Sequence, residues 1–384
     1  MRIGMVCNEY PPSACGGIGT LTQVVARSLA GAGHEVRVIG TYAPGASDTA
    51  LENDRGVVVR RLPMPEHPGG WLRARYALFR IVRQWSQRGE VDLIEVPDYE
   101  GWSAGWPKLP VPVVIRLSGS GTYFASEMGQ PPHRTTRWLE RAALRRADFW
   151  IAESNYLLAG TRRVFGLEPP PHAVLYNSVE LPHDVSFASR APNRVVFAGT
   201  LTEKKGILSL VAAWGRVRAA CGDAELHIYG KDGAHNGQSM QEYVRSRLCD
   251  APESSVRFHG HVSLERLERA FQEARVAVMP SYTEGFALAP LHAMACGCPT
   301  IFTRRSSGEE LITHGRDGLL VDPARPEEIA DAIVLLLQDG ALAERVGSAG
   351  RMRIVRDFSA QTWGERNEVF YTKCLADFKR RVNS

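Results

Sequence analysis

The chain has 384 residues, 44% of them hydrophobic, and carries 46 Lys and Arg against 42 Asp and Glu, a formal net charge of +4. A chain of this length exceeds one ordinary domain, and its apolar residues suffice for two cores. The charges are spread over both halves, which excludes the concentrated basic face of a nucleic-acid-binding protein. Seven cysteines, an odd number in a long chain, favour free thiols in the cytosol over a disulfide framework.

The sequence predicts neither a signal peptide nor a membrane span. Its first apolar run, residues 2–7, is short and is followed by Asn8 and Glu9, and no longer window is apolar enough to cross a bilayer. We therefore expect a cytoplasmic protein. Residues 71–87 combine an apolar stripe with a second face that carries several arginines. This pattern favours a surface helix with its stripe in the core, and it leaves open a peripheral contact with anionic lipid at the inner face of a membrane.

In chain order, short apolar strands alternate with helices through the first half. The first strand, residues 2–7, is followed by a Gly- and Pro-rich loop and by a helix at 20–32, which Gly33 ends. Further strands are expected at residues 36–39, 57–61, 93–96, 113–117, 150–152 and 173–176. Further helices are expected at residues 71–87, 134–146 and 155–165.

The same alternation resumes after residues 180–192, a polar, proline-bearing stretch that we interpret as a link between domains. Strands are expected at residues 195–198, 225–229, 256–259, 276–279 and 300–302. Helices are expected at residues 207–220, 239–248, 264–274, 326–338 and 360–380. Two βα series of similar length predict an α/β fold of two doubly wound, Rossmann-like domains, residues 1–180 and 193–359, that face each other across a cleft.

Gly16, Gly17 and Gly19 separate the first strand from the first helix. Glycine lets a backbone approach a phosphate closely, and a helix N-terminus favours an anion. The run lacks Gly-Lys-Ser/Thr and is not a G-x-G-x-x-G fingerprint, which argues against ATP and nicotinamide cofactors. It is either a phosphate-binding loop or a plain strand-to-helix turn, and alone it does not separate the two.

A second loop bounded by glycines, from Gly199 to Gly206, follows the first strand of the second series and contains Lys204 and Lys205. A lysine beside a glycine at a helix start is a compact cation suited to a diphosphate. By itself the pattern is more typical of a solvated lysine pair near a helix cap.

Residues 284–288, Glu-Gly-Phe-Ala-Leu, come just before Pro290, which suits the first turn of a helix. The backbone amides of Phe286 to Leu288 would then point toward an anion, and Glu284 would accept hydrogen bonds from sugar hydroxyls. An acidic residue at a helix start is also favourable against the helix dipole alone. Spacing leaves both interpretations open.

Two residue pairs have the look of metal ligands, but no metal site is predicted. Cys296 and Cys298 have no second cysteine pair nearby, so small buried residues at a helix end explain them better. His259 and His261 flank Gly260 at a strand end, where the lining of a nucleotide pocket fits better.

Together these segments resemble the family 4 retaining glycosyltransferases of GT-B fold. The resemblance covers nearly the whole chain and depends on Gly16-Gly17, Asn177, Lys205-Gly206 and the segments 281–288, 293–301 and 308–323. It implies that the first domain, joined by a returning helix at 360–384, binds the acceptor. It implies that the second domain binds a nucleotide-diphosphate sugar, usually UDP-linked. Transfer would retain the anomeric configuration and would need no metal and no cofactor beyond the donor substrate.

The resemblance also implies a role for each candidate residue. Lys205 and Glu284 would be catalytic, the lysine stabilising the leaving diphosphate and the glutamate holding the donor sugar. The donor-binding residues would be Gly16, Gly17, Gly199, Thr200, Lys204, Lys231, His259, Gly260, His261, Gly285, Phe286, Ala287, Leu288 and His292. The acceptor-binding residues would be Asp98, Tyr99, Glu100, Ser118 and Tyr123.

Three positions depart from the family pattern. His292 stands where the family has a second glutamate that grips the ribose, and an imidazole bonds one hydroxyl rather than two. Thr200 stands where an arginine is common, so Lys205 would carry more of the phosphate charge, assisted by Lys231 or Arg304. Ser118 stands where the family often has a histidine near the acceptor.

We therefore expect a retaining glycosyltransferase that acts on a saccharide, lipid-linked or small-molecule acceptor, for instance in exopolysaccharide biosynthesis. The three departures leave open a sugar-nucleotide-binding protein that has lost turnover. A sugar-nucleotide epimerase on the same architecture is a further alternative, which the chain-long match of motifs disfavours. Oligomeric state is not predicted.

Overall fold

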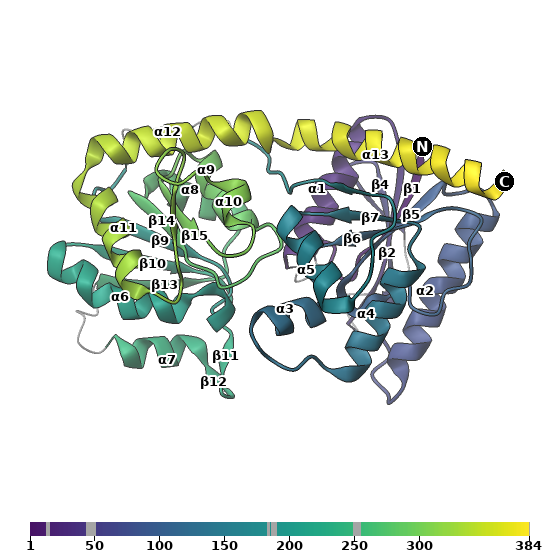
Figure 1. Ribbon diagram of the computed structural model, residues 1–384, viewed down its shortest axis with the longest axis horizontal. Helices are drawn as coiled ribbons and strands as arrows, with labels where there is room; N and C mark the ends of the chain where they lie inside the picture. Colours follow the sequence, from purple (N-terminus) through teal and green to yellow (C-terminus); the bar gives the residue numbers. More distant parts are fainter. Residues whose placement is uncertain (13–15, 44–50, 183–184, 186–189, 249–254, 384) are drawn as a thin grey trace. The chain divides into compact units, whose positions relative to one another are not determined.

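The computed structural model describes residues 1–12, 16–43, 51–182, 185, 190–248 and 255–383 (Figure 1). The chain divides into two compact units. The first comprises residues 1–177 and 360–384, and the second comprises residues 178–359. The ranges predicted from the sequence were 1–180 with 360–384 for the first domain and 193–359 for the second.

The first unit is built on an eight-stranded sheet in the order β3-β4-β2-β1-β5-β6-β7-β8. Its strands are β1 Arg2–Val6, β2 Glu35–Tyr42, β3 Leu51–Asp54, β4 Val57–Pro63, β5 Leu93–Pro97, β6 Val113–Leu117, β7 Phe149–Ala152 and β8 His172–Val174. Neighbouring strands are parallel except β3 and β4, which form an antiparallel edge hairpin. Because β1 pairs with both β2 and β5, the strand order reverses between β1 and β5.

Helices cover both faces of this sheet. They are α1 Gly17–Gly31, α2 Gly70–Gln87, α3 Gly121–Glu127, α4 Arg134–Arg146, α5 Asn155–Phe165 and α13 Ala360–Asn383, with a 3₁₀ turn η1 at Tyr99–Gly101. Ile3 and Met5 of β1 belong to the apolar cluster that includes α1 and α13, whereas Val6 belongs to the cluster on the α2 side. That alternation follows from the two-residue period of a strand, and it gives the sheet two buried faces.

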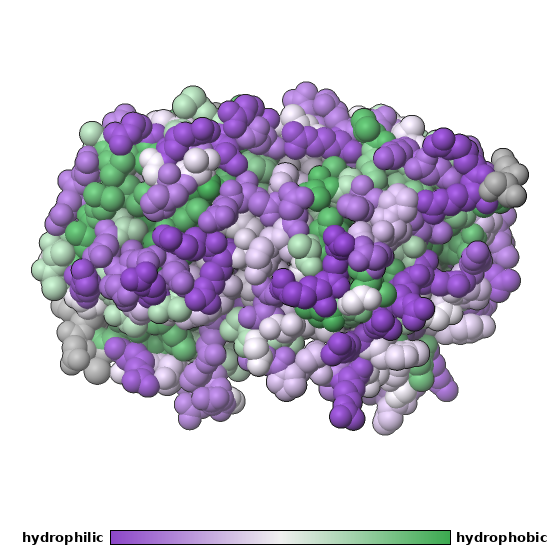
Figure 2. All heavy atoms as spheres, viewed as in Figure 1, coloured by the Kyte–Doolittle hydropathy of each residue, from purple (hydrophilic) through white to green (hydrophobic). Residues whose placement is uncertain are grey.

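The apolar stripe predicted for residues 71–87 lies in the core. Leu78, Val82 and Trp85 of α2 are buried against the sheet, at 0%, 0% and 6% exposure. The stripe is therefore part of the core of the first unit. None of the helices within the described ranges combines the length and hydropathy needed to cross a membrane. In the view of Figure 2, hydrophilic residues dominate the surface.

Buried polar side chains fix α13 to the first unit. Arg116 of β6 donates to Glu95 of β5 through Nε at 2.7 Å and Nη2 at 2.9 Å, and its Nη2 also donates to Asn367 of α13 at 2.6 Å. The Tyr371 hydroxyl of α13 donates to Glu95 at 2.5 Å. Each of these four side chains is buried, so every charge in the network is paired where water is excluded.

The second unit is built on a six-stranded parallel sheet in the order β13-β10-β9-β14-β15-β16. The strands are β9 Arg194–Ala198, β10 Glu225–Tyr229, β13 Val256–Gly260, β14 Val276–Met279, β15 Thr300–Thr303 and β16 Leu319–Val321, with a two-stranded ribbon of β11 Ala234–His235 and β12 Gln238–Ser239. The helices are α6 Ile207–Ala220, α7 Met240–Arg247, α8 Leu264–Glu273, α9 Leu288–Ala295, α10 Gly308–Leu311, α11 Pro326–Gln338 and α12 Gly340–Asp357, with a 3₁₀ turn η2 at Glu203–Lys205.

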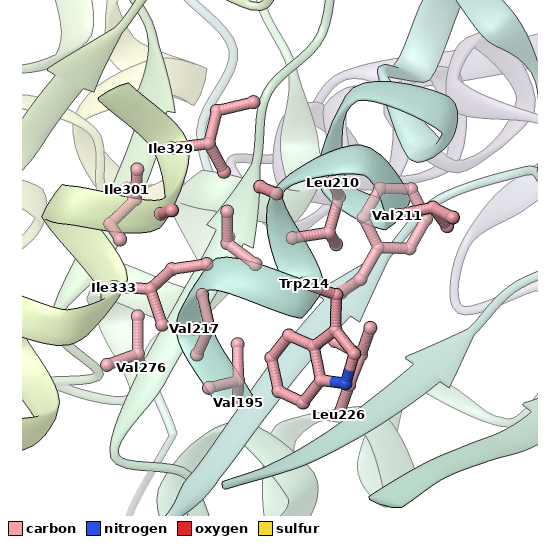
Figure 3. Close-up of a cluster of buried hydrophobic side chains, with 14 of the residues drawn as sticks. Val195, Leu210, Val211, Trp214, Val217, Leu226, Val276, Ile301, Ile329 and Ile333 are labelled. Atoms are coloured by element: carbon pink, nitrogen blue, oxygen red, sulfur yellow. The ribbon is translucent and has the colours of Figure 1, made fainter. Parts of the chain in front are cut away.

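One face of this sheet is sealed by α6 and α11. Trp214 of α6 and Ile333 of α11 meet side chains of the strands, including Val195 and Val276 (Figure 3). Trp214, Ile333, Val195 and Val276 are all fully buried. This core holds β9 and β14 rigidly side by side, and the loops that follow these two strands carry the candidate catalytic residues.

Some predicted elements need correction. The first helix begins at Gly17 rather than Thr20, and the strand expected at 173–176 is β8 at His172–Val174. Strand β16 and helices α3 and α12 were not predicted. The predicted link at 180–192 lies partly outside the described residues. Within it, Arg190 donates to the carbonyl oxygens of Phe271, Ala274 and Cys296, which fixes this end of the link to the second unit.

Candidate active site

The second unit reverses its strand order between β9 and β14. From β9 the chain moves outward through β10 and β13, and from β14 it moves outward through β15 and β16. The loops that leave the carboxyl ends of β9 and β14 therefore start side by side, and the connections beyond them run in opposite directions along the sheet. Such a switch point is where open α/β sheets bind ligands.

These two loops are in close backbone contact. The Tyr282 N–H donates to the Lys204 carbonyl at 2.8 Å. Gly206 has φ of +73°, and a Cβ atom there would lie 1.9 Å from the Pro280 carbonyl oxygen. Only glycine fits both the left-handed backbone and this approach. The contact holds Lys205 against the loop that carries Glu284.

Lys205 and Glu284 form a two-point ion pair. The Lys205 ammonium donates to both carboxylate oxygens of Glu284, at 2.7 and 2.9 Å. Glu284 is only 6% exposed. Burial alone would raise the pKa of its carboxyl, but Lys205 and Lys204 outweigh burial and lower that pKa, so Glu284 is ionised at neutral pH. A lysine has three N–H donors and a carboxylate about four lone-pair sites, so the pair keeps capacity for a polyhydroxylated, anionic ligand.

Residues 285–288 lead from Glu284 into helix α9. The helix begins at Leu288 with Ala287 as its N-cap, as expected from the place of Pro290 in its first turn. Phe286 is 3% exposed and packs on Phe358 with ring centroids 5.4 Å apart. Its side chain therefore supports the loop, and a ligand at this helix start would meet backbone.

His292 lies in α9 and is 7% exposed. Its Nδ1 is 3.3 Å from an Oε1 oxygen of Glu268, a residue of α8. Sequence reasoning missed Glu268, because nothing in the spacing of the two residues shows that α8 and α9 pack side by side. Among the described residues this Nδ1 has no hydrogen-bond partner, so Glu268 acts on the imidazole through its nearby charge.

The remaining donor candidates follow neighbouring strands at the same edge of the sheet. The Leu201 N–H donates to the Lys231 carbonyl at 2.9 Å, and the Gly230 N–H donates to the Gly260 carbonyl at 2.8 Å. The structure thus brings the loops after β9, β10 and β13 together. Thr200 and His261 are exposed at this edge.

The His259 ring stacks on two side chains of β10, His227 and Tyr229. Its ring lies parallel to Tyr229 at 4.2 Å, and its Nε2 is 3.1 Å from Nδ1 of His227. Burial and the neighbouring His227 lower the pKa of His259, so the imidazole is neutral at pH 7. Together with the exposed His261, this ring belongs to a surface rather than to a metal site.

The two cysteines that were weighed as metal ligands, Cys296 and Cys298, are both buried. Cys296 and Cys298 are 0% and 1% exposed, and burial raises the pKa of both thiols. Within the described ranges, no cluster of His, Cys, Asp and Glu has the arrangement of a metal site.

In the first unit, the loops after β1 and β5 flank the other switch point. Gly16 is the N-cap of α1, and the chain itself supplies an anion there. The Glu9 carboxylate accepts the Gly16 N–H and the Gly19 N–H, each at 3.0 Å. Glu9 thus occupies two of the amides that were expected to face a phosphate, and a phosphate at this helix start would have to replace that carboxylate.

The acceptor candidates divide into buried and exposed residues. Tyr99 and Glu100 are exposed and Ser118 is half-buried, whereas Asp98 and Tyr123 are both 0% exposed. Asp98 accepts the N–H groups of Ser118 and Gly119, at 3.1 and 3.3 Å. Asp98 therefore supports the backbone of the 118–119 loop, and neither Asp98 nor Tyr123 presents its side chain at the surface.

Burial also changes the charge beneath this loop. It raises the pKa of Asp98 to about 8, with Glu140 and Glu153 adding to the shift and the backbone amides opposing it. It raises the pKa of Glu153 to about 7, although Asn177 donates to that carboxyl at 2.9 Å. Glu153 was not predicted, although its place just after β7 is a sequence signal that could have found it.

The comparisons with known proteins agree with this geometry. Residues 16–178 match the family described as glycosyl transferase 4-like domain, and residues 192–339 match glycosyl transferases group 1. The chain belongs to the family 4 glycosyltransferases of GT-B fold. It is therefore an enzyme that transfers a glycosyl group.

Its relatives are distant but span the whole chain. It is 27% identical to a glycogen synthase of Mycobacterium tuberculosis, over 94% of this chain and 92% of the relative. It is 26% identical to an alpha-maltose-1-phosphate synthase of Mycolicibacterium smegmatis, over 98% of this chain and 100% of the relative.

Two solved structures share the fold. Sucrose-phosphate synthase from Thermosynechococcus elongatus superposes with a TM-score of 0.84 at 22% identity, covering 98% of this chain and 99% of that one. Anabaena HepE in complex with UDP and glucose superposes with a TM-score of 0.74 at 17% identity, covering 97% and 99%.

Proposed function

We propose that this glycosyltransferase moves a hexosyl group from a UDP-sugar to a saccharide, lipid-linked or small-molecule acceptor, with retention and without a metal. The observation that carries the proposal is the bidentate Lys205–Glu284 pair at the switch point of the second sheet. A fixed cation suits a diphosphate, and a fixed carboxylate suits sugar hydroxyls.

In the proposed reaction, the bond between the anomeric carbon and the diphosphate oxygen breaks, and its electron pair leaves with the diphosphate. An acceptor hydroxyl oxygen forms the new bond on the same face of the sugar, and its proton passes to the leaving phosphate oxygen. Lys205 stabilises the negative charge that develops on the diphosphate, and Lys204 adds a second positive charge nearby. Glu284 positions the sugar by accepting its hydroxyl protons.

The names of the relatives guide the choice of substrates. HepE was solved with UDP-glucose, and other relatives are named for glycogen, maltose 1-phosphate and sucrose phosphate synthesis. We therefore propose UDP-glucose as the first donor to test, with glucose 1-phosphate, fructose 6-phosphate and maltooligosaccharides as acceptors. No cofactor beyond the donor is proposed.

The test measures nucleotide release from a panel of UDP-, ADP- and GDP-sugars, with and without each acceptor and with and without EDTA. Retention is read from the anomeric proton coupling of the product. Glu284→Gln is expected to abolish release, whereas Glu344→Gln, which changes an exposed glutamate of α12, is expected to leave release unchanged. A product of inverted configuration, or equal activity in the two variants, would contradict the proposal.

A second candidate is a sugar-nucleotide-binding protein without turnover. The pairing of His292 with Glu268 and the occupation of the α1 N-terminus by Glu9 favour it. Tight UDP binding without nucleotide release from any donor would favour the binding protein over the active UDP-sugar transferase proposed above.

A further inference from the structure

A pocket of about 430 Å³ lies in the first unit, away from the loops described above. It is bordered by Val113, the first residue of β6, and by Asp148, which immediately precedes β7. The pocket therefore opens at the amino-terminal edge of the sheet. The acceptor candidates follow the carboxyl ends of the same strands, and five residues of β6 separate the two edges by about 16 Å.

The rim of this pocket is strongly basic. Lys108, Arg145, Arg146 and Arg381 line it, and Asp148 is the one acidic residue that lines it. Within the described ranges, Lys108, Arg145 and Arg146 make no ion pair. Asp148 accepts the Val113 N–H at 2.9 Å. Burial raises the pKa of Asp148, and the positive charges of Arg381, Lys108 and Arg146 oppose that rise.

A buried hydroxyl provides an independent sign of a ligand. Ser103 lines the pocket, is 1% exposed, and its Oγ has no hydrogen-bond partner among the residues that the structure describes. An unsatisfied buried hydroxyl is costly, and such groups are usually paired. Arg145 and Arg146 lie in the last turn of α4, where the helix dipole alone favours cations. The dipole gives no reason for the unpaired Ser103.

The inner wall is apolar. Trp106, Leu109 and Val113 line the pocket and are 5%, 9% and 8% exposed. The volume lies in the range of small-molecule sites, which combine apolar walls with a few polar groups. A basic rim over an apolar wall fits a ligand with an anionic head and a small carbon skeleton.

We propose that this pocket binds a small organic phosphate ester from solution, with the phosphate between Lys108 and the arginines of α4. The Ser103 hydroxyl donates to an oxygen of the ligand, and the carbon skeleton lies against Trp106 and Leu109. The site is separate from the donor site and does not depend on the proposed donor or acceptor.

The test is calorimetric titration of the full chain with three probes: inorganic phosphate, glycerol 3-phosphate and glucose 6-phosphate. Lys108→Ser combined with Arg146→Ser is expected to weaken binding about tenfold, because two cationic contacts to the phosphate are lost. The matched control is Arg134→Ser with Arg137→Ser, which removes the same charge from exposed positions of α4, the helix that carries Arg146. The control is expected to bind as the wild type does, and thermal unfolding midpoints verify that both variants are folded.

Ser103→Ala provides a second test of the site, because it leaves the net charge unchanged. It is expected to weaken binding about threefold or more, because a hydrogen bond to a charged group is lost. The proposal is overturned if no probe binds the wild type, or if the pocket variant and the control lose affinity equally. It is also overturned if vesicles containing phosphatidic acid bind with the same dependence on Lys108 and Arg146 while the soluble esters do not, since the ligand would then be a lipid headgroup.

Discussion

Replacing Lys205 by methionine is expected to destabilise the protein through Glu284. The substitution leaves a carboxylate that is 6% exposed without its nearest cation. Breaking a buried ion pair from one side costs about 3–5 kcal/mol. The Lys205 side chain is 27% exposed and Lys204 remains nearby, so we discount that figure to about 2–3 kcal/mol in the free energy of unfolding at pH 7.5.

The pH dependence of the stability loss shows whether the ionised Glu284 carboxylate causes it. In the wild type the lowered pKa of Glu284 means that its ionised form adds stability at neutral pH, and this is lost as the pH falls through that pKa. In Lys205→Met the largest remaining influence is burial, which raises the pKa. The deficit relative to the wild type should therefore be largest near pH 7.5 and should shrink toward pH 5, where Glu284 takes up a proton.

Urea unfolding of the wild type, both single variants and the double variant Lys205→Met/Glu284→Gln provides the assay. The double variant should recover at least about 1 kcal/mol relative to the sum of the single losses, because it removes both charges together. Nucleotide release should stay at least about 100-fold below wild type in all three, since the transition-state contacts are absent. A deficit that is equal at pH 7.5 and pH 5, or single losses that simply add, would refute the reasoning.

The remaining predictions concern the loops and helices around the two switch points. Gly206→Ala should lower the free energy of unfolding by more than about 2 kcal/mol, because φ is +73° and the new Cβ would lie 1.9 Å from the Pro280 carbonyl. The control Gly215→Ala, in the open middle of α6, should raise the free energy of unfolding by up to about 1 kcal/mol. Urea unfolding of the two variants provides the comparison. Glu9→Gln should cost about 1 kcal/mol, because the charged acceptor at the α1 N-terminus is lost, and a shift to higher stability would contradict that role. Glu268→Gln should raise the KM for the donor severalfold at unchanged kcat, because His292 loses the negative charge beside it, whereas Glu265→Gln on the exposed side of α8 should change neither.

Most regular elements are predictable because their patterns are local. The helices at Arg134–Arg146, Ile207–Ala220 and Pro326–Gln338 match the expected bounds, since the apolar spacing is local and a proline marks the first turn of the last of them. Helix α12 was missed because it contains three glycines, which lower its intrinsic propensity. Gly347 is there for packing: a Cβ atom would lie 2.3 Å from the Gly297 carbonyl. That reason exists only in the folded unit.

The candidate site likewise has features that the sequence predicts and features that only the structure shows. Lys205 and Glu284 were singled out by the loops they occupy, but each loop alone left a second interpretation open, and their roles came from the resemblance to the family. The strand order, known only from the structure, shows that the two loops follow adjacent strands at a switch point. The direct ion pair between these two residues could not be predicted from the sequence, and neither could the partners of the other candidates. Glu268 lies 24 residues before His292, and Glu9 reaches Gly16 across a loop, so neither contact leaves a periodic pattern in the sequence.

Burial also reverses roles that residue type alone implies. Asp98 has the position of an acceptor ligand, at the carboxyl end of β5, but it is 0% exposed and both oxygens accept backbone N–H groups. With a pKa near 8 it is protonated at neutral pH, and above that value an added charge would lie close to Glu140 and Glu153. Alkaline pH should therefore loosen the 118–119 loop before it affects the Lys205–Glu284 pair. A rise in acceptor KM above pH 8 at constant donor KM would show this, and Asp98→Asn should remove the rise because it keeps the side chain neutral.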